Sequence, residues 1–112
     1  MSPRALERQD WAAFFTLMSK ALSGRQMMLE LVGEDIGDQI EEDWSLFQDS
    51  YFDEDTDTIY LRTAYVEHQI PRPQAIEVQE DTALRAIGVW DSDGILQIIH
   101  FRDPLMLDSY AH

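Results

Sequence analysis

Three aspartates alternate along one short acidic segment. Asp53, Asp55 and Asp57 occupy every second position of the stretch "DEDTD". Calcium loops place ligands at their first, third and fifth positions in this way, because carboxylate oxygens can then surround one ion. The match ends there, since the sixth loop position should be glycine and is Thr58, and the twelfth should be glutamate and is Ala64. A divalent-cation site at Asp53, Asp55 and Asp57 is therefore the alternative, and a polar turn between two strands is the preferred interpretation.

The other residue types that carry chemistry form no recognisable motif. His68, His100 and His112 show neither the H-E-x-x-H nor the H-x-H spacing of metal sites. A histidine on a strand more often pairs with a neighbouring group. The sequence contains no cysteine, no G-x-S-x-G elbow and no glycine-rich phosphate loop. We therefore expect no enzymatic activity, no catalytic residue and no cofactor.

Aromatic residues lie in or beside the acidic segment. An aromatic side chain next to carboxylates can anchor a basic partner, because it adds contact area to the attraction between charges. The alternative role for these aromatics is packing across neighbouring strands, which favours the same residue types. The predicted partner-binding residues are Trp44, Tyr51, Asp53, Asp55, Asp57 and Tyr60.

The net charge restricts the kind of partner. The chain of 112 residues has 22 acidic and 8 basic residues, a formal charge of −14. Such a field repels phosphates and anionic lipids, so we expect a protein partner with a basic surface and no nucleic acid. A membrane partner is not expected either, because the sequence lacks the run of about 18 apolar residues that a spanning helix needs. The absence of cysteine suits a reducing compartment, and we predict a cytoplasmic protein.

One amphipathic helix and several strands must position these side chains. The spacing of Trp11, Phe14, Phe15, Met18 and Leu22 predicts a helix over about residues 8–22 that ends near Gly24. Beyond it, "RQMMLELVG" has the alternation of a strand, and "EDIGDQIEED" suggests a turn or one helical turn.

Two hairpins are indicated farther along. The acidic segment connects the β-prone arms "WSLFQDSYF" and "TIYLRTAYV", and "DSDG" at residues 91–94 connects "LRAIGVW" to "ILQIIHF". The prolines of "IPRPQ" place that stretch at a sheet edge, and Pro104 is expected to end the last strand.

We therefore predict a single α+β domain over residues 1–112. It consists of the N-terminal amphipathic helix packed on a bent antiparallel sheet of five or six strands, within a β-rich region of about 26–103 followed by a short C-terminal tail. A small SH3-like barrel is one closed form of this arrangement.

Four stretches resemble a bacterial family of small uncharacterised proteins, DUF5335. They are "WAAFFTLMSKALSGR", "LELVGEDIGDQ", "YFDEDTDTI" and "VWDSDGILQIIHFRDPL". The resemblance implies a compact α+β bacterial domain and carries over no catalytic or binding residue. The predicted function is accordingly that of a non-enzymatic cytoplasmic domain that acts through protein contacts, and the alternative is a protein that responds to divalent cations.

Overall fold

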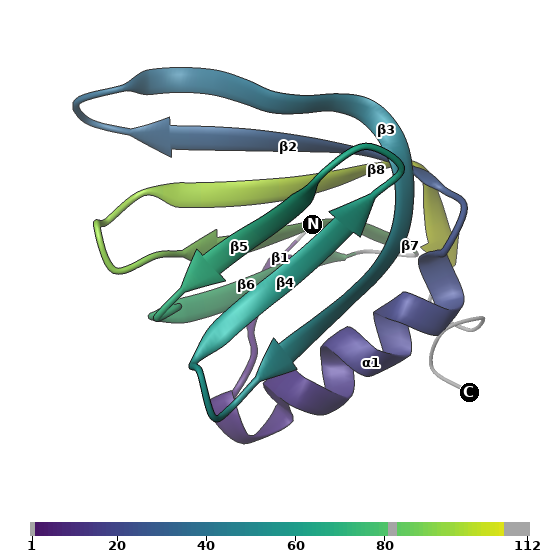
Figure 1. The fold of residues 1–112 in the computed structure, drawn as a ribbon, viewed down its shortest axis with the longest axis horizontal. Coiled ribbons are helices and arrows are strands. Elements are labelled where there is room, and N and C mark those ends of the chain that lie inside the picture. The colour runs from purple at the N-terminus through teal and green to yellow at the C-terminus, as the bar shows by residue number, and fades with distance from the viewer. Residues whose placement is uncertain (1, 81–82, 107–112) are drawn as a thin grey trace.

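The structure, a computed structural model, describes residues 2–80 and 83–106 (Figure 1). The described elements form one antiparallel sheet of eight strands in the order β1-β6-β7-β8-β2-β3-β4-β5, with one α-helix and a short 3-10 helix. The bounds are β1 Ser2–Ala5, η1 Arg8–Asp10, α1 Trp11–Leu22, β2 Gln26–Gly33, β3 Gly37–Asp53, β4 Thr58–Thr63, β5 Glu67–Pro71, β6 Ala75–Glu80, β7 Ala83–Trp90 and β8 Leu96–Met106.

The prediction of an N-terminal helix packed on five or six strands was wrong. A strand, β1, precedes the helix, and the sheet has eight strands. The sequence "SPRA" of β1 lacks apolar alternation, and this edge strand is held by backbone pairing with β6 and by the ion pair between Arg4 and Glu80 at 2.8 Å. In the described residues β1 and β5 stand at opposite ends of the strand order and do not pair, so the sheet is open and is not an SH3-like barrel.

The bend of the sheet is made by β3, which is 17 residues long. Its beginning pairs with β2 as far as Leu46, and its end pairs with β4 from Phe47 onward. The register shifts around Leu29 in β2, and Trp44 has a positive φ of 50°. β3 therefore belongs to two half-sheets, which we call the first half (β1, β6, β7, β8, β2 and the beginning of β3) and the second half (the end of β3, β4 and β5).

Helix α1 and both halves enclose one core. All five residues of the predicted apolar stripe are buried, and Gly24, just beyond the helix, has a positive φ of 89°. Ring contacts connect the elements: Trp11 meets Phe52 edge-on at 5.4 Å, and Phe47 of the second half meets Phe101 of the first at 5.9 Å. Figure 1 shows α1 along the bottom of the molecule, beneath the curve of β3.

Pro104 does not end the last strand as predicted. β8 continues through it to Met106, because β2 pairs with β8 only as far as Phe101 and leaves one side of β8 without a partner strand among the described residues. A proline is tolerated where no neighbouring strand needs a hydrogen bond from its backbone nitrogen. The rest of the predicted C-terminal tail, including His112, lies outside the described residues.

Candidate functional site

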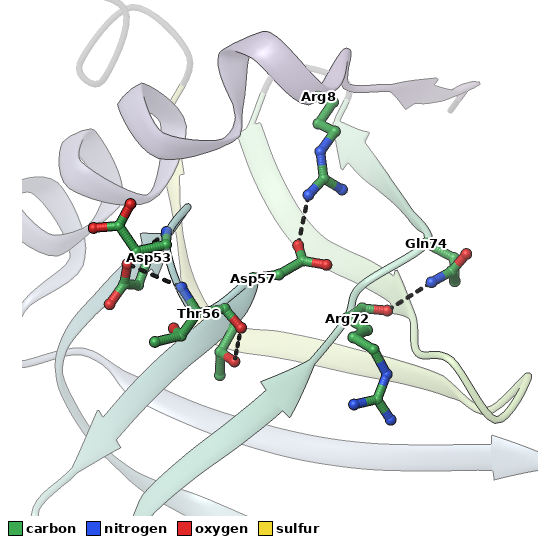
Figure 2. Close-up of polar contacts among 8 residues, drawn as sticks. Arg8, Asp53, Thr56, Asp57, Arg72 and Gln74 are labelled. Atoms are coloured by element: carbon green, nitrogen blue, oxygen red, sulfur yellow. Dashed lines mark hydrogen bonds and ion pairs between the residues drawn. The ribbon is translucent and has the colours of Figure 1, made fainter.

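The acidic segment forms the tip of the β3–β4 hairpin, as predicted. Asp53 pairs with Thr58 where the two strands meet. The side chain of Asp53 organises the turn, because its Oδ1 accepts hydrogen bonds from the backbone N–H groups of Asp55, at 2.9 Å, and Thr56, at 3.4 Å (Figure 2). Asp and Asn side chains stabilise turns in this way. The carboxylate of Asp53, the first ligand of the alternative cation site, thus already accepts hydrogen bonds from the turn backbone.

An arginine from outside the hairpin contacts the last of the three aspartates. Arg8 donates from a guanidinium nitrogen to Oδ1 of Asp57 at 2.5 Å, reaching it from the segment ahead of the helix (Figure 2). The same guanidinium lies over the rings of Trp11, at 4.9 Å, and Phe52, at 5.6 Å. This corner of the hairpin therefore combines a carboxylate with aromatic surface and accommodates a guanidinium group.

Two tyrosines stack across the hairpin, on the side that faces away from the core. Tyr51 and Tyr60 are cross-strand partners whose ring centres lie 4.7 Å apart at an interplanar angle of 14°. Tyr51 is 45% exposed. Beside them Arg62 donates two hydrogen bonds to Asp49, which hold the pKa of the Asp49 carboxyl below its ordinary value. The tyrosine pair thus lies between an ion pair and the acidic turn.

A shallow cleft lies beside the acidic turn and has Tyr51 in its lining. Its volume is about 430 Å³, and its lining residues are Ala12, Tyr51, Phe52, Asp53, Glu54 and Asp55. Aromatic and carboxylate groups therefore share one concave surface.

Trp44 does not belong to this surface, although it was predicted with it. It lies at the bend of β3, where the guanidinium of Arg102 is 4.2 Å from its ring centre. Trp44 precedes Asp53 by nine positions, and an extended strand of that length spans roughly 30 Å. The structure thus brings together five of the six predicted site residues and places the sixth, Trp44, at the bend in the middle of β3.

Two glutamate–histidine pairs were not identified as pairs from the sequence. His68 Nε2 lies 2.9 Å from Oε2 of Glu42, and His100 Nε2 lies 2.8 Å from Oε1 of Glu30. Each histidine is satisfied by a neighbouring carboxylate, as expected for histidines on strands. The strand register could have revealed the second pair, because His100 pairs with Met28, two positions from Glu30 on the same side of β2.

Glu42 is a buried carboxylate with several hydrogen-bond donors. Its Oε1 accepts a bond of 2.9 Å from the Thr63 hydroxyl. Burial opposes the charge, but hydrogen bonds from Ser45, His68 and Thr63 outweigh it and hold the pKa of Glu42 below its ordinary value of 4.5. Thr63 Oγ1 in turn accepts bonds from the N–H groups of Tyr65 and Val66, so Glu42 connects the bend of β3 to the β4–β5 turn.

Among the residues that the structure describes, no three His, Cys, Asp or Glu side chains gather in an arrangement that could hold a metal ion. Within residues 2–80 and 83–106, no helix is long and apolar enough to cross a membrane.

Comparisons with known proteins agree with the resemblance of the sequence motifs. The model of the family of unknown function DUF5335 matches residues 2–110. A similar protein from Aquifex aeolicus (strain VF5), described as uncharacterised, is 30% identical over 110 residues, which cover 96% of this chain and 98% of the relative. No solved structure matches. The chain therefore belongs to the DUF5335 family.

Proposed function

We propose that this chain is a non-enzymatic cytoplasmic domain that binds a basic protein surface. The proposed binding residues are Tyr51, Asp53, Asp55, Asp57 and Tyr60, which we call the acidic face. The observation that carries the proposal is the Tyr51–Tyr60 stack beside the acidic turn, in which Tyr51 is exposed. The contact at the bend between Trp44 and Arg102 has no part in it.

The tyrosine pair adds contact area to the charge of the acidic turn. Carboxylates in water mainly accelerate encounter with a basic partner, whereas affinity depends on contacts from which water is excluded. A tyrosine offers a large area with few rotatable bonds, so little conformational entropy is lost when it is covered. The Tyr51 and Tyr60 rings already hold each other in position, which lowers that loss further.

Arg8 illustrates the kind of group that fits beside this face. Its guanidinium combines an ion pair to Asp57 with contacts to the Trp11 and Phe52 rings. An arginine of a partner can use the same chemistry on Tyr51 and the neighbouring carboxylates, because a planar guanidinium both stacks on rings and bonds to carboxylates.

The cation-responsive function is the less favoured proposal. Asp53 is bonded to the turn backbone and Asp57 to Arg8, so ion binding would have to displace two existing interactions. We expect Ca²⁺ or Mg²⁺ to bind no more tightly than the millimolar range of weak oxygen sites. Calorimetry at physiological salt tests this, and micromolar binding that disappears in Asp55→Asn would favour the cation function instead.

The docking proposal is tested by comparing two triple variants with equal charge change. Asp53→Asn/Asp55→Asn/Asp57→Asn neutralises the acidic face, while Glu34→Gln/Asp35→Asn/Asp93→Asn neutralises exposed acids at the other hairpin tips. Each form serves as bait in a native-host lysate, and the proteins that bind are quantified by mass spectrometry. We expect a partner that the first variant loses and the second keeps.

Surface plasmon resonance on that partner then separates charge from contact area. Neutralising the acidic face should slow association and reduce its salt dependence, and Tyr51→Ala/Tyr60→Ala should accelerate dissociation. If the association rate of the partner changes neither with salt nor in the first triple variant, the interface lies elsewhere on the domain.

A further inference from the structure

Strand β5 stands at one end of the strand order. Among the described residues it pairs with β4 and leaves its other edge open. At one end of the pairing the N–H of Thr63 donates to the carbonyl of Val66, at 2.9 Å, and at the other end the N–H of Arg72 donates to the carbonyl of Asp57, at 2.7 Å. Bonded pairs recur at every second residue of an antiparallel ladder, so the even-numbered residues of β5 bond to β4.

The odd-numbered residues of β5 therefore direct their backbone groups away from β4. We call Glu67, Gln69 and Pro71 the open edge, and all three residues are exposed. Pro71 fits its position, because its nitrogen carries no hydrogen and no ladder bond is lost there. The open edge thus offers two donors, the N–H groups of Glu67 and Gln69, and three carbonyl acceptors at the spacing of a strand.

Strand β1, at the other end of the strand order, is less suited to pairing. The N–H of Leu6 donates to the carbonyl of Ile76 at 2.9 Å, and the same alternation then directs the backbone groups of Pro3 and Ala5 away from β6. Because a proline has no N–H, Ala5 supplies the one outward donor of Ser2–Ala5. A proline on an edge hinders the addition of another strand, and the middle of the open edge has no such block.

The side chains of the open edge continue the acidic face. Gln69 is the cross-strand partner of Tyr60, which is the partner of Tyr51. Residues directly opposite each other share one side of a sheet, so Gln69 lies in one row with the tyrosine stack, on the outer side of the second half. Glu67 stands opposite Arg62 in the next row. A strand added to β5 would lie about 4.8 Å beyond Gln69 and would extend both rows.

The turn ahead of β5 adds aromatic and apolar area next to the open edge. Tyr65 is 84% exposed and Val66 is 45% exposed. Their backbone N–H groups both donate to Oγ1 of Thr63, which fixes the turn. A segment that runs along β5 and past Glu67 can therefore cover side chains that are already held in place.

We propose that an extended basic segment of the partner binds along the open edge as an added strand. This binding mode rests on the proposed function and concerns the same partner. The main chain of the segment bonds to the free groups of the open edge, and every second side chain lies beside the acidic face. Charge favours a basic segment, because β5 contains no lysine or arginine and Glu67 attracts an opposite charge on a neighbouring strand.

Gln69 provides a matched pair of variants for the test. Gln69→Pro removes the outward N–H but leaves the ladder to β4 intact, because that N–H takes no part in it. Gln69→Ala removes the side chain and keeps the N–H. The probe is a short peptide in which lysine and valine alternate, which is basic and favours an extended chain. Calorimetric titration should show roughly fivefold weaker binding to Gln69→Pro than to Gln69→Ala, the usual net value of one hydrogen bond.

Amide hydrogen exchange gives a second measurement that needs no variant. The amide protons of Glu67 and Gln69 should exchange quickly in the free chain and slowly in the presence of the peptide. Thermal melts confirm that the variants are folded before their binding is compared.

Three outcomes would overturn the proposed binding mode. If the peptide binds and Asp53→Asn/Asp55→Asn/Asp57→Asn weakens it, but both amides stay unprotected and the Gln69 variants bind equally, the docking function stands and strand addition is wrong. If the peptide does not bind the parent, the result counts against both. If the chain alone forms a dimer that Gln69→Pro abolishes in sedimentation equilibrium, a second copy occupies the open edge.

Discussion

The inner and outer sides of the sheet each carry one glutamate–histidine pair. The nitrogen–oxygen distances are nearly equal, 2.9 Å for Glu42–His68 and 2.8 Å for Glu30–His100. Their exposure differs: the side chains are 6% and 16% exposed in the inner pair, and 16% and 30% in the outer pair. Equal geometry therefore does not imply equal importance, because the cost of breaking such a pair increases with its burial.

The surroundings of the two glutamates differ as well. Glu42 accepts bonds from a threonine, a serine and a histidine. Glu30 is bonded to another acid, Asp38, which is the main cause that lowers the pKa of Glu30 and raises that of Asp38. The inner glutamate is thus a charge surrounded by donors, whereas the pKa of the outer one is set mainly by a second carboxyl group.

The largest expected effect contrasts apolar side chains on the two sides of the sheet. Phe15→Ala removes a fully buried ring and should lower the free energy of unfolding by about 3 kcal/mol, through lost contacts and a cavity. Ile98→Ala, on the outer side, should cost about 1 kcal/mol or less in dilute protein, because its side chain is only half-buried. Urea melts measure both. If Phe15→Ala and the parent unfold at the same urea concentration, the helix is a binding element and not a core element.

The next effect compares the two glutamates directly. Glu42→Ala should destabilise the chain by roughly 2 to 3 kcal/mol, because it leaves the His68 ring without its acceptor and the buried Thr63 hydroxyl with only the Val66 carbonyl at 3.3 Å. Glu30→Ala should cost about 1 kcal/mol or less, since water can replace the lost bond. If guanidinium melts give similar losses of unfolding free energy for the two variants, burial does not determine how much each glutamate–histidine pair contributes to stability.

The pH dependence of stability should also differ between Glu42 and Glu30, with a smaller effect than the alanine substitutions. The pKa of Glu42 is depressed in the folded state, so its contribution is complete above 4.5 and is lost as pH falls through the lower folded value. The stability difference between the parent and Glu42→Gln should therefore shrink below pH 4.5.

The Glu30→Gln variant is the control for this titration. The depressed pKa of Glu30 and the raised pKa of Asp38 act in opposite directions, so the difference between the parent and this variant should change little over the same range. Thermal melts across acidic pH give both curves. If the stability difference between the parent and Glu42→Gln stays constant below pH 4.5, Glu42 is not the group that titrates.

The smallest effect is expected on the outer side of the second half. Asp49→Asn removes the charge that Arg62 contacts, yet both groups are well solvated and salt screens them. The melting temperature should match that of the parent within error at physiological salt, as measured by calorimetry. A clear decrease would show that this ion pair holds the tyrosine surface in place.

The elements that the sequence predicted are those with local causes. The apolar stripe of α1 follows from helical spacing, and both aspartate-led hairpins follow from turn chemistry, since Asp91 accepts bonds from the N–H groups of Asp93 and Ile95 as Asp53 does in its own turn.

The strand count failed where long-range pairing decides the structure. The predicted arm "TIYLRTAYV" breaks after Thr63, because the Thr63 hydroxyl bonds to the backbone of the following turn and a separate strand, β5, begins at Glu67. In the candidate site, Tyr51 and Tyr60 were predicted from their positions in the two arms of the acidic hairpin, and they stack as cross-strand partners. Alternation could not show that β3 carries Trp44 far from them, or that Arg8 reaches Asp57 from a distant part of the chain.

The length of β3 has a consequence for how the molecule comes apart. One backbone supplies hydrogen bonds to β2 through its first part and to β4 through its last part, and the core rings Phe47 and Phe101 meet across the junction. The two halves share one core, so opening either half separates the Phe47 and Phe101 rings and exposes core residues of the other half, and local openings of one half alone are suppressed. The protein should therefore behave as a single foldon, with slowly exchanging amides of the two halves released together.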